Sequence, residues 1–177
     1  MKGSIWRKWD LHLHTPKTKL SNNFILDGKE ESEIWKEYCK LIEESDVSVF
    51  GITDYFCCEN YFEFLDVFKT YHPESRKVFF LNIEFRLPVA VNKQGEEVNI
   101  HILFDNKVPK SKVDELLLNL KTNNTNESGA HIKCKNLTSD KIVSATISID
   151  AMNRGLKEVF GTSKPYLIIA AANNAGL

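Results

Sequence analysis

Residues 6–16 read WRKWDLHLHTP, and this stretch gives the clearest indication of both the fold and the chemistry of the chain. Polar and apolar residues alternate along it, which is the period of a β-strand, and Pro16 ends the pattern. His12 and His14 are two residues apart and therefore share one face of the predicted strand. Both imidazoles can then bind one metal ion, so the stretch predicts a metal site. The alternative is a pair of surface histidines on a half-exposed strand.

Three carboxylates accompany these histidines at strand ends. Asp10 belongs to the same alternating set and is a candidate to orient a ligand histidine by accepting its hydrogen bond. Glu84 ends the apolar run 78–83, where an ionised carboxylate costs free energy unless it is paired or bound to a metal ion. Asp54 ends a second apolar run, 47–53, and its simpler interpretation is a helix cap.

The other candidates for the site are one histidine and three cationic side chains. His101 opposes the apolar face of its strand, and alone it would more often be a hydrogen-bonded core residue than a ligand. Arg86, two residues after Glu84, either pairs with that carboxylate or holds a substrate phosphate. Lys17 and Lys19 follow the first strand and are candidate substrate-binding residues, with plain solvated charge as the alternative.

Predicted strands and helices alternate along the rest of the chain, which is the mark of an α/β domain. His14, Asp54 and Glu84 each fall at the carboxyl end of a predicted strand, where parallel α/β folds assemble their sites. We expect further strands at 47–53, 78–85 and 166–172, and the last of these should be buried. Helices are expected at 31–45, 61–68, 112–121 and 149–160, with Ser111 as the cap of the third. A hairpin should turn at 92–96, and 122–136 should be a loop.

The composition excludes several classes of protein. The 177 residues have 42% hydrophobic content, enough to bury the core of one domain spanning 1–177. A net charge of −1 gives no general attraction to nucleic acid, so a polyanion must be bound locally. No apolar run is long enough to span a bilayer, no signal peptide is evident and the four cysteines form no C-x-x-C pair, so we expect a cytoplasmic protein with reduced thiols and no membrane partner. No phosphate-binding loop of an ATPase occurs.

Residues 9–16 resemble the opening motif of the PHP (polymerase and histidinol phosphatase) superfamily of metal-dependent phosphoesterases. The other matching segments follow in the order that this superfamily has, namely residues 51–54, residues 83–84 and the strand that carries His101. The closest resemblance is to TrlF-type proteins, in which a PHP domain precedes an AAA-like or SMC-like ATPase linked to nucleic-acid processing and phage defence. The segments that carry this closer match are 6–10, 52–56, 82–87 and 98–101.

The resemblance implies a distorted (β/α)7 barrel, of which residues 1–177 would be the N-terminal and central part without the last strands. It implies that His12 and His14 bind one divalent ion, that Glu84 bridges two ions and that His101 binds the second. Zn, Mn or Fe suits imidazole and carboxylate ligands. By the same resemblance, we expect Asp54 and Arg86 to be catalytic residues.

Two departures from the family pattern affect the expected metal count. Tyr55 stands where PHP enzymes usually have a histidine ligand of a third metal, so we expect two ions per site. Asn173 and Asn174 stand where a later histidine ligand is common. Tyr55, Asn173 and Asn174 are therefore kept as supporting residues or substitute ligands.

The expected function is hydrolysis of phosphate esters, including nuclease activity on DNA or RNA, beside an ATPase domain or partner chain. The alternative is a catalytically weakened PHP module that binds nucleic acid or the ATPase partner. An amidohydrolase-like barrel that hydrolyses C–N bonds is a third reading, which Glu84 disfavours. The apolar strand 166–172 requires a neighbour, which we expect from a homo-oligomer or from an added chain.

Overall fold

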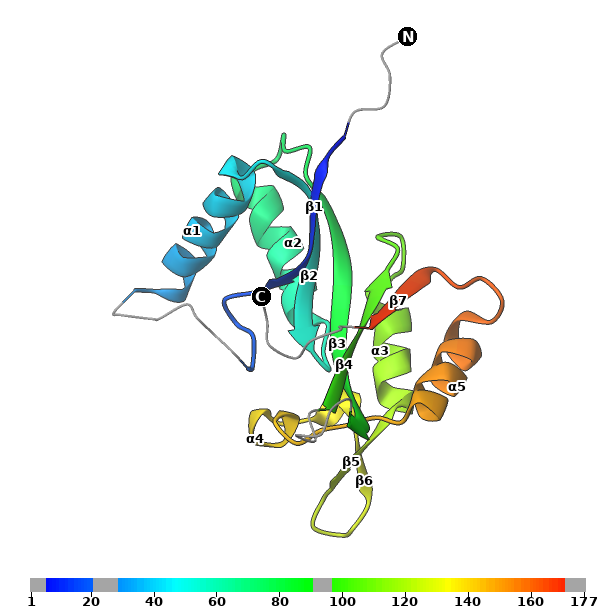
Figure 1. Cartoon of the computed structure of the whole chain (residues 1–177). Coiled ribbons are helices and arrows are strands. Elements are labelled where there is room, and N and C mark those ends of the chain that lie inside the picture. The colour runs from blue at the N-terminus through cyan, green and yellow to red at the C-terminus, as the bar shows by residue number, and fades with distance from the viewer. Residues whose placement is uncertain (1–5, 21–28, 91–96, 171–177) are drawn as a thin grey trace.

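The computed structural model describes residues 6–20, 29–90 and 97–170. They form an α/β domain around a five-stranded mixed sheet of order β1-β2-β3-β4-β7 (Figure 1). Strands β1, β2 and β3 are mutually parallel, while β4 runs antiparallel to both β3 and β7. The strands of this sheet are β1 (Lys8–His14), β2 (Val47–Tyr55), β3 (Val78–Ala90), β4 (Glu97–Phe104) and β7 (Tyr166–Ala170).

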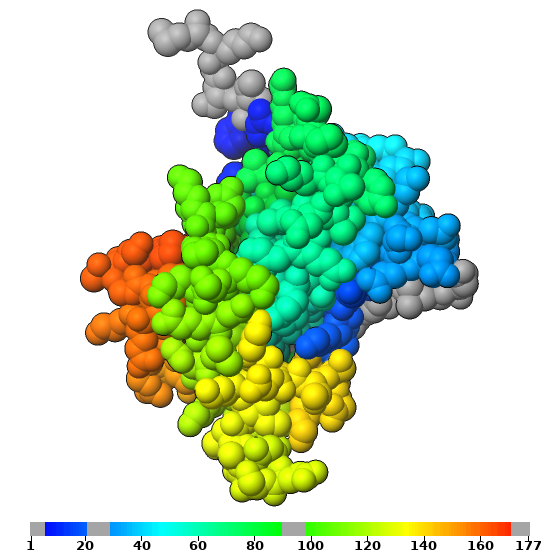
Figure 2. Space-filling view, turned by 180° about the vertical axis from the view of Figure 1, so that it is seen from behind, coloured from blue at the N-terminus to red at the C-terminus, as the bar shows by residue number. Residues whose placement is uncertain are grey.

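Helices α1 (Glu31–Glu44), α2 (Glu59–Tyr71), α3 (Lys110–Asn119) and α5 (Ile149–Phe160) share one apolar core with the sheet. The ring of Phe79 on β3 lies 4.9 Å and 4.7 Å from those of Phe64 and Phe68 on α2. On β4, Phe104 contacts Phe160 of α5 with ring centroids 5.8 Å apart. Figure 2 shows the side of the molecule that these helices cover. Aromatic packing therefore fixes which face of the sheet is the core face.

The alternation of β3 separates a core face from a polar face. Ile83 and Phe85 are fully buried among the apolar residues under the helices. Glu84 points the other way, since side chains alternate along a strand, and it is paired in register with His101 of β4. The polar residues of the strand thus meet on the face opposite the helices.

Strand β1 carries a register shift between Asp10 and Leu13. Asp10 is aligned with Phe50, a residue of the buried core, whereas His14 is aligned with Thr53 on the polar face. The prediction that Asp10 shares a face with the two histidines is therefore wrong. The extra residue at the shift lets the strand turn its histidine half toward the polar face, as β-bulges do.

Residues 122–136 are predicted to be a loop, but the structure has a hairpin and a short helix there, and the segment packs on the main core. Strands β5 (Lys121–Thr125) and β6 (His131–Lys133) form a two-stranded hairpin, followed by the 3-10 helix η1 (Cys134–Asn136) and by α4 (Ser139–Ile142). The Asn126 side chain accepts hydrogen bonds from the backbone of Ser128 and Ala130 and closes the turn. These strands are polar and short, so no apolar alternation marked them in the sequence.

The α/β class is confirmed, and the expected hairpin pairing of β3 with β4 is present. Its turn at 92–96 lies outside the described residues. Those residues form an open sheet and no closed barrel. Strand β7 is an edge strand rather than a buried one, and its Leu167 side chain is 59% exposed. Helix α3 begins at Lys110 after Pro109, whose φ of −72° suits a helix start, so Ser111 is no cap.

No helix within 6–20, 29–90 and 97–170 is long and apolar enough to cross a membrane.

Candidate metal centre

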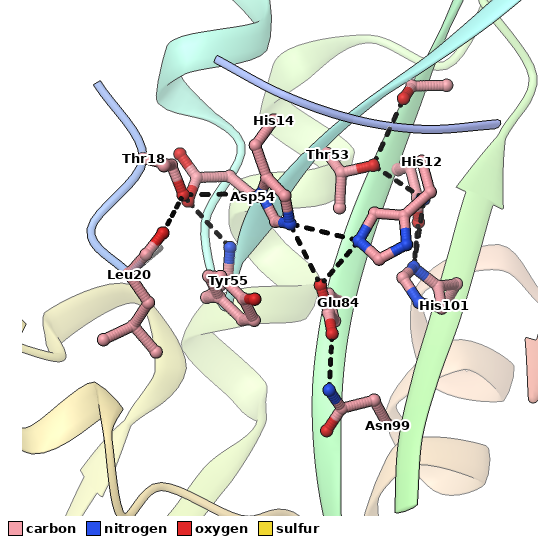
Figure 3. A network of polar contacts seen from close by, with 12 residues as sticks. His12, His14, Thr18, Leu20, Thr53, Asp54, Tyr55, Glu84, Asn99 and His101 are labelled. Carbon is pink, nitrogen blue, oxygen red and sulfur yellow. Dashed lines mark hydrogen bonds and ion pairs between the residues drawn. The ribbon is translucent and has the colours of Figure 1, made fainter. Parts of the chain in front are cut away.

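Four candidate ligands come together on the polar face of the sheet (Figure 3). His12 and His14 are supplied by β1, Glu84 by β3 and His101 by β4. The ligand atoms of His12, Glu84 and His101 all lie within 4.8 Å of one another. His12 is the middle of the three imidazoles, with its ring centroid 4.9 Å from that of His14 and 4.5 Å from that of His101. Strand β1 and the β3–β4 hairpin, which are distant in sequence, therefore build one cluster.

Three of the donor atoms form a compact triangle. His12 Nε2 lies 3.0 Å from His14 Nε2, and Glu84 Oε2 lies 3.2 Å and 3.5 Å from these two nitrogens. Glu84 Oε2 is nevertheless buried without a well-aligned hydrogen-bond partner. Ligands about 2.1 Å from a tetrahedral or octahedral ion are separated by roughly 3.0–3.4 Å. The triangle has the size of one face of such a coordination polyhedron.

Glu84 is a buried carboxylate that a hydrogen bond holds through one oxygen, Oε1. Its side chain is 2% exposed, and Oε1 accepts a hydrogen bond from Asn99 Nδ2 at 2.6 Å. Burial alone would raise the pKa of Glu84, but the contacts with His12 and His14 outweigh it and lower that pKa to about 2. The carboxylate is therefore ionised at neutral pH and ready to bind a cation.

His101 is held as a neutral ligand by Asn82. The amide nitrogen of Asn82 donates to Leu11 O at 2.8 Å and to Thr53 Oγ1 at 2.9 Å, which uses both of its protons. His101 Nδ1 lies 3.0 Å from Asn82 Nδ2 and 3.3 Å from Asn82 Oδ1. Because both Nδ2 protons have oxygen acceptors, Oδ1 is the atom of Asn82 that can accept the proton of His101 Nδ1. Burial lowers the pKa of His101 to about 4. Nε2 of His101 is thus left with a lone pair, as a metal ligand requires.

The donor set fits a divalent transition metal. Imidazole and carboxylate ligands without thiolate suit Zn, Mn or Fe. The side chain of His12 is 42% exposed, so the centre is open to solvent on that side, while Glu84 is enclosed. His12, His14, Glu84 and His101 are the residues that would hold the metal.

Asp54 and Tyr55 occupy two sides of His14. The ring of Tyr55 stacks on His14 with centroids 4.9 Å apart and an interplanar angle of 17°. The Asp54 carboxylate points to the core side, where it accepts hydrogen bonds from Thr18 Oγ1 at 3.2 Å and from the side chain of Asn60. Asp54 therefore lies outside the triangle of donor atoms and reaches it only through Thr18 and His14.

The cationic candidates have protein partners. Lys17 Nζ lies 3.0 Å from a carboxylate oxygen of both Glu31 and Glu63, which raises the Lys17 pKa, mainly through Glu63. Lys19 Nζ contacts the backbone oxygen of Leu137 at 3.4 Å. The Arg86 guanidinium donates to the backbone oxygen of Val143.

Asn173 and Asn174 lie outside the described residues.

A second group of ligand-type residues, Cys58, Glu59 and Asp114, lies away from this centre. Lys135 forms ion pairs with both carboxylates and so supplies the positive charge that a metal would otherwise provide. We therefore interpret this group as an ion-pair cluster. Its carboxylates are useful as controls for those of the metal centre.

Two functional residues were missed in the sequence, although a signal was present. Asn82 and Asn99 each stand two residues before a ligand, Glu84 and His101 respectively, on otherwise apolar strands. This period-two placement puts them on the ligand face. Comparison of the chain with protein-family models, curated proteins and solved structures finds no match.

Proposed function

We propose that this chain is a metal-dependent phosphoesterase of the PHP type with two divalent ions in its centre. The observation that carries the proposal is the triangle of His12 Nε2, His14 Nε2 and Glu84 Oε2, with edges of 3.0, 3.2 and 3.5 Å. In this proposal His12 and His14 would hold the first ion, His101 would hold the second, and Glu84 would be shared between them. The sequence resemblance supports the same division of roles.

The chain's own residues prepare the site in three ways. Glu84 is ionised because its pKa is about 2, and His101 is neutral because its pKa is about 4. Asn82 and Asn99 hold these two side chains in place. When bound, the ions polarise phosphoryl oxygens and lower the pKa of a water ligand, which supplies the nucleophile. The exposed side of His12 admits the ester.

The proposed substrates are phosphodiesters of nucleic acids or nucleotides. Arg86 is on the same face as Glu84, two residues along β3, and is the proposed phosphate-binding residue. Lys17 is a further candidate, for which a phosphate would have to compete with the carboxylates of Glu31 and Glu63. An ATPase domain or partner chain would complete the system that the TrlF resemblance implies.

Tyr55 favours a second candidate function, a weakened module that binds nucleic acid or the ATPase partner without turnover. Its ring stacks on His14 at the position where a third metal ligand is usual in the family. A tyrosine there contributes packing rather than an imidazole nitrogen. The two candidates differ in turnover, not in metal binding.

Elemental analysis and a phosphodiester hydrolysis assay together test the proposal. The chain is purified without added metal, stripped with a chelator and reloaded with Mn or Zn, and hydrolysis of bis(p-nitrophenyl) phosphate is followed. We expect about two ions per chain and metal-dependent turnover. Glu84→Gln should lose both, because it keeps the volume but removes the bridging charge.

Glu59→Gln is the matched control, because it removes a carboxylate from the ion-pair cluster only. It should retain metal content and rate. A wild-type chain that binds no metal would refute the proposed centre. A chain that binds metal without hydrolysing the ester, or any of several nucleotide diesters, would favour the binding module.

A further inference from the structure

His14 can act as a metal ligand only in one tautomer. Its Nε2 faces His12 Nε2 at 3.0 Å and Glu84 Oε2 at 3.5 Å, so the lone pair that binds an ion must be on Nε2. A neutral imidazole then carries its single proton on Nδ1. That proton requires an acceptor on the side of the ring away from the cluster.

The acceptor is the hydroxyl of Thr18. Thr18 Oγ1 lies 3.4 Å from His14 Nδ1, a contact at the long end of the hydrogen-bond range. The hydroxyl has one proton of its own, with Asp54 Oδ1 at 3.2 Å and Leu20 O at 3.1 Å as acceptors. A carboxylate is the stronger acceptor of the two. Thr18 is buried, so bulk water does not compete for these positions.

The buried position of the Asp54 carboxylate is costly unless a positive charge lies nearby. The carboxylate is buried, and its hydrogen bonds come from neutral donors, the Tyr55 backbone at 2.8 Å and the side chains of Thr18 and Asn60. Burying an anion among neutral donors costs free energy. A cation bound through His14 would compensate that charge across one hydroxyl.

The loop that carries Thr18 is fixed at both sides. Thr18 N donates to Thr15 O at 3.1 Å, which closes a turn directly after β1. Asn60 of α2 donates to Lys17 O at 3.0 Å and also to the Asp54 carboxylate. The hydroxyl is therefore held between the carboxylate and the imidazole by the fold itself.

We propose that Thr18 and Asp54 are positioning residues that fix the tautomer and orientation of His14. This inference rests on the proposed metal centre and adds two residues to it. Thr18 accepts the Nδ1 proton of His14 and donates to Asp54, which strengthens the hydroxyl as an acceptor. The Nε2 lone pair then stays directed at the ion, and the imidazole becomes a better donor to it.

Cobalt(II) titration of the metal-free chain tests this proposal, with absorbance in the visible range as the readout. Thr18→Val, which keeps the shape and removes the hydroxyl, should weaken Co(II) binding about 10- to 100-fold. Thr18→Ser should restore it. Asp54→Asn should also weaken Co(II) binding. The double variant Thr18→Val/Asp54→Asn should bind Co(II) little more weakly than Thr18→Val, because Asp54 acts on His14 through Thr18.

Thr122→Val is the matched control, since Thr122 is also buried and its hydroxyl donates to Ile132 O at 3.0 Å, away from the centre. It should lower stability and leave Co(II) affinity and spectrum unchanged.

The outcomes separate the two proposals. A wild-type chain without Co(II) binding would overturn the metal centre and this inference with it. A wild-type chain that binds Co(II), beside a folded Thr18→Val variant with the same Co(II) affinity and spectrum, would overturn the positioning role alone. Thr122→Val weakening Co(II) binding as much as Thr18→Val would also overturn it.

Discussion

Asn82 shows how one amide can support two strands and a ligand at once. It joins the backbone of Leu11 on β1 to the Thr53 hydroxyl on β2 and accepts from His101 on β4. We expect Asn82→Ala to lower metal affinity about 10- to 100-fold and to cost about 1–3 kcal/mol of unfolding free energy. Metal titration and urea unfolding measure the two effects.

Asn123→Ala is the control for that substitution. Asn123 also bonds to backbone on both sides of its amide, at Ser144 O and Thr146 N, but on the far hairpin. It should lower stability without changing metal affinity. Equal metal affinities for Asn82→Ala and the wild type would show that His101 is held by packing alone.

The metal-free chain should lose stability as the pH falls from about 6.5 towards 4. The pKa of His101 is about 4 in the folded chain, mainly because of burial, against an ordinary value of 6.5. Between these values the unfolded chain binds a proton that the folded chain does not, so the free energy of unfolding decreases with falling pH. Below pH 4 this contribution is constant. Urea unfolding at several pH values measures it.

His101→Gln should flatten the profile between pH 6.5 and 4.5. Measurements stay above pH 4.5 because the lowered pKa of Glu84 stabilises the folded chain fully there, and that stabilisation is lost only at lower pH. A His101→Gln profile as steep as the wild-type one would assign the slope to other groups.

At the scale of the residue, the pattern of the sequence indicated which side chains cluster but not what holds them. His12, His14, Glu84 and His101 share the polar face, as strand alternation suggested. Asp10 does not, because a register shift inside β1 cannot be read from alternation. Contacts such as that of Thr18 with His14 depend on loop geometry, which a single sequence does not specify.

At the scale of the element, the pairing of β1 with β2 depends on Gly51. A Cβ atom on this residue would lie 2.3 Å from the backbone oxygen of Leu11, so β1 would have to move. Leu11 precedes the ligand His12, and its oxygen also accepts from Asn82. We expect Gly51→Ala to destabilise the chain by about 1–3 kcal/mol and to weaken metal binding. Thermal unfolding and Co(II) titration measure both.

Gly155→Ala in α5 is the matched control, since its nearest neighbours are flexible atoms of the Leu120 and Leu116 side chains. It should change stability little and metal affinity not at all. If Gly51→Ala bound metal like Gly155→Ala, the position of β1 would not be critical for the centre.

Elements with strong periodicity were predictable and polar ones were not. Helix α1 was expected at 31–45 and spans Glu31–Glu44, and Gly161, with φ of 59°, ends α5 as expected. Hairpin β5–β6 was missed, because side-chain hydrogen bonds of Thr122 and Asn126 stabilise it in place of apolar alternation. Exposure of β7 depends on its place at the sheet edge, which is a property of the topology.

At the scale of the whole molecule, the centre joins parts of the chain that are far apart in sequence. Its ligands lie on β1, β3 and β4, and the helices pack on the opposite face. The mixed sheet follows from the β3–β4 hairpin, which reverses the parallel order that alternation alone suggests. Closure into a barrel is a long-range property, and the described residues form an open sheet.

A bound metal should therefore stabilise the whole fold, because it links β1 to the centre of the sheet. A ligand that binds only the folded chain adds about 2.7 kcal/mol at 100 times its Kd. For a chain of this size each kcal/mol raises Tm by about 2–4 °C, so saturating Zn or Mn should raise Tm by roughly 5–11 °C. A chelator should reverse the shift. Glu84→Gln should show no shift and Glu59→Gln the full one, whereas equal shifts in both variants would place the stabilising ion away from Glu84.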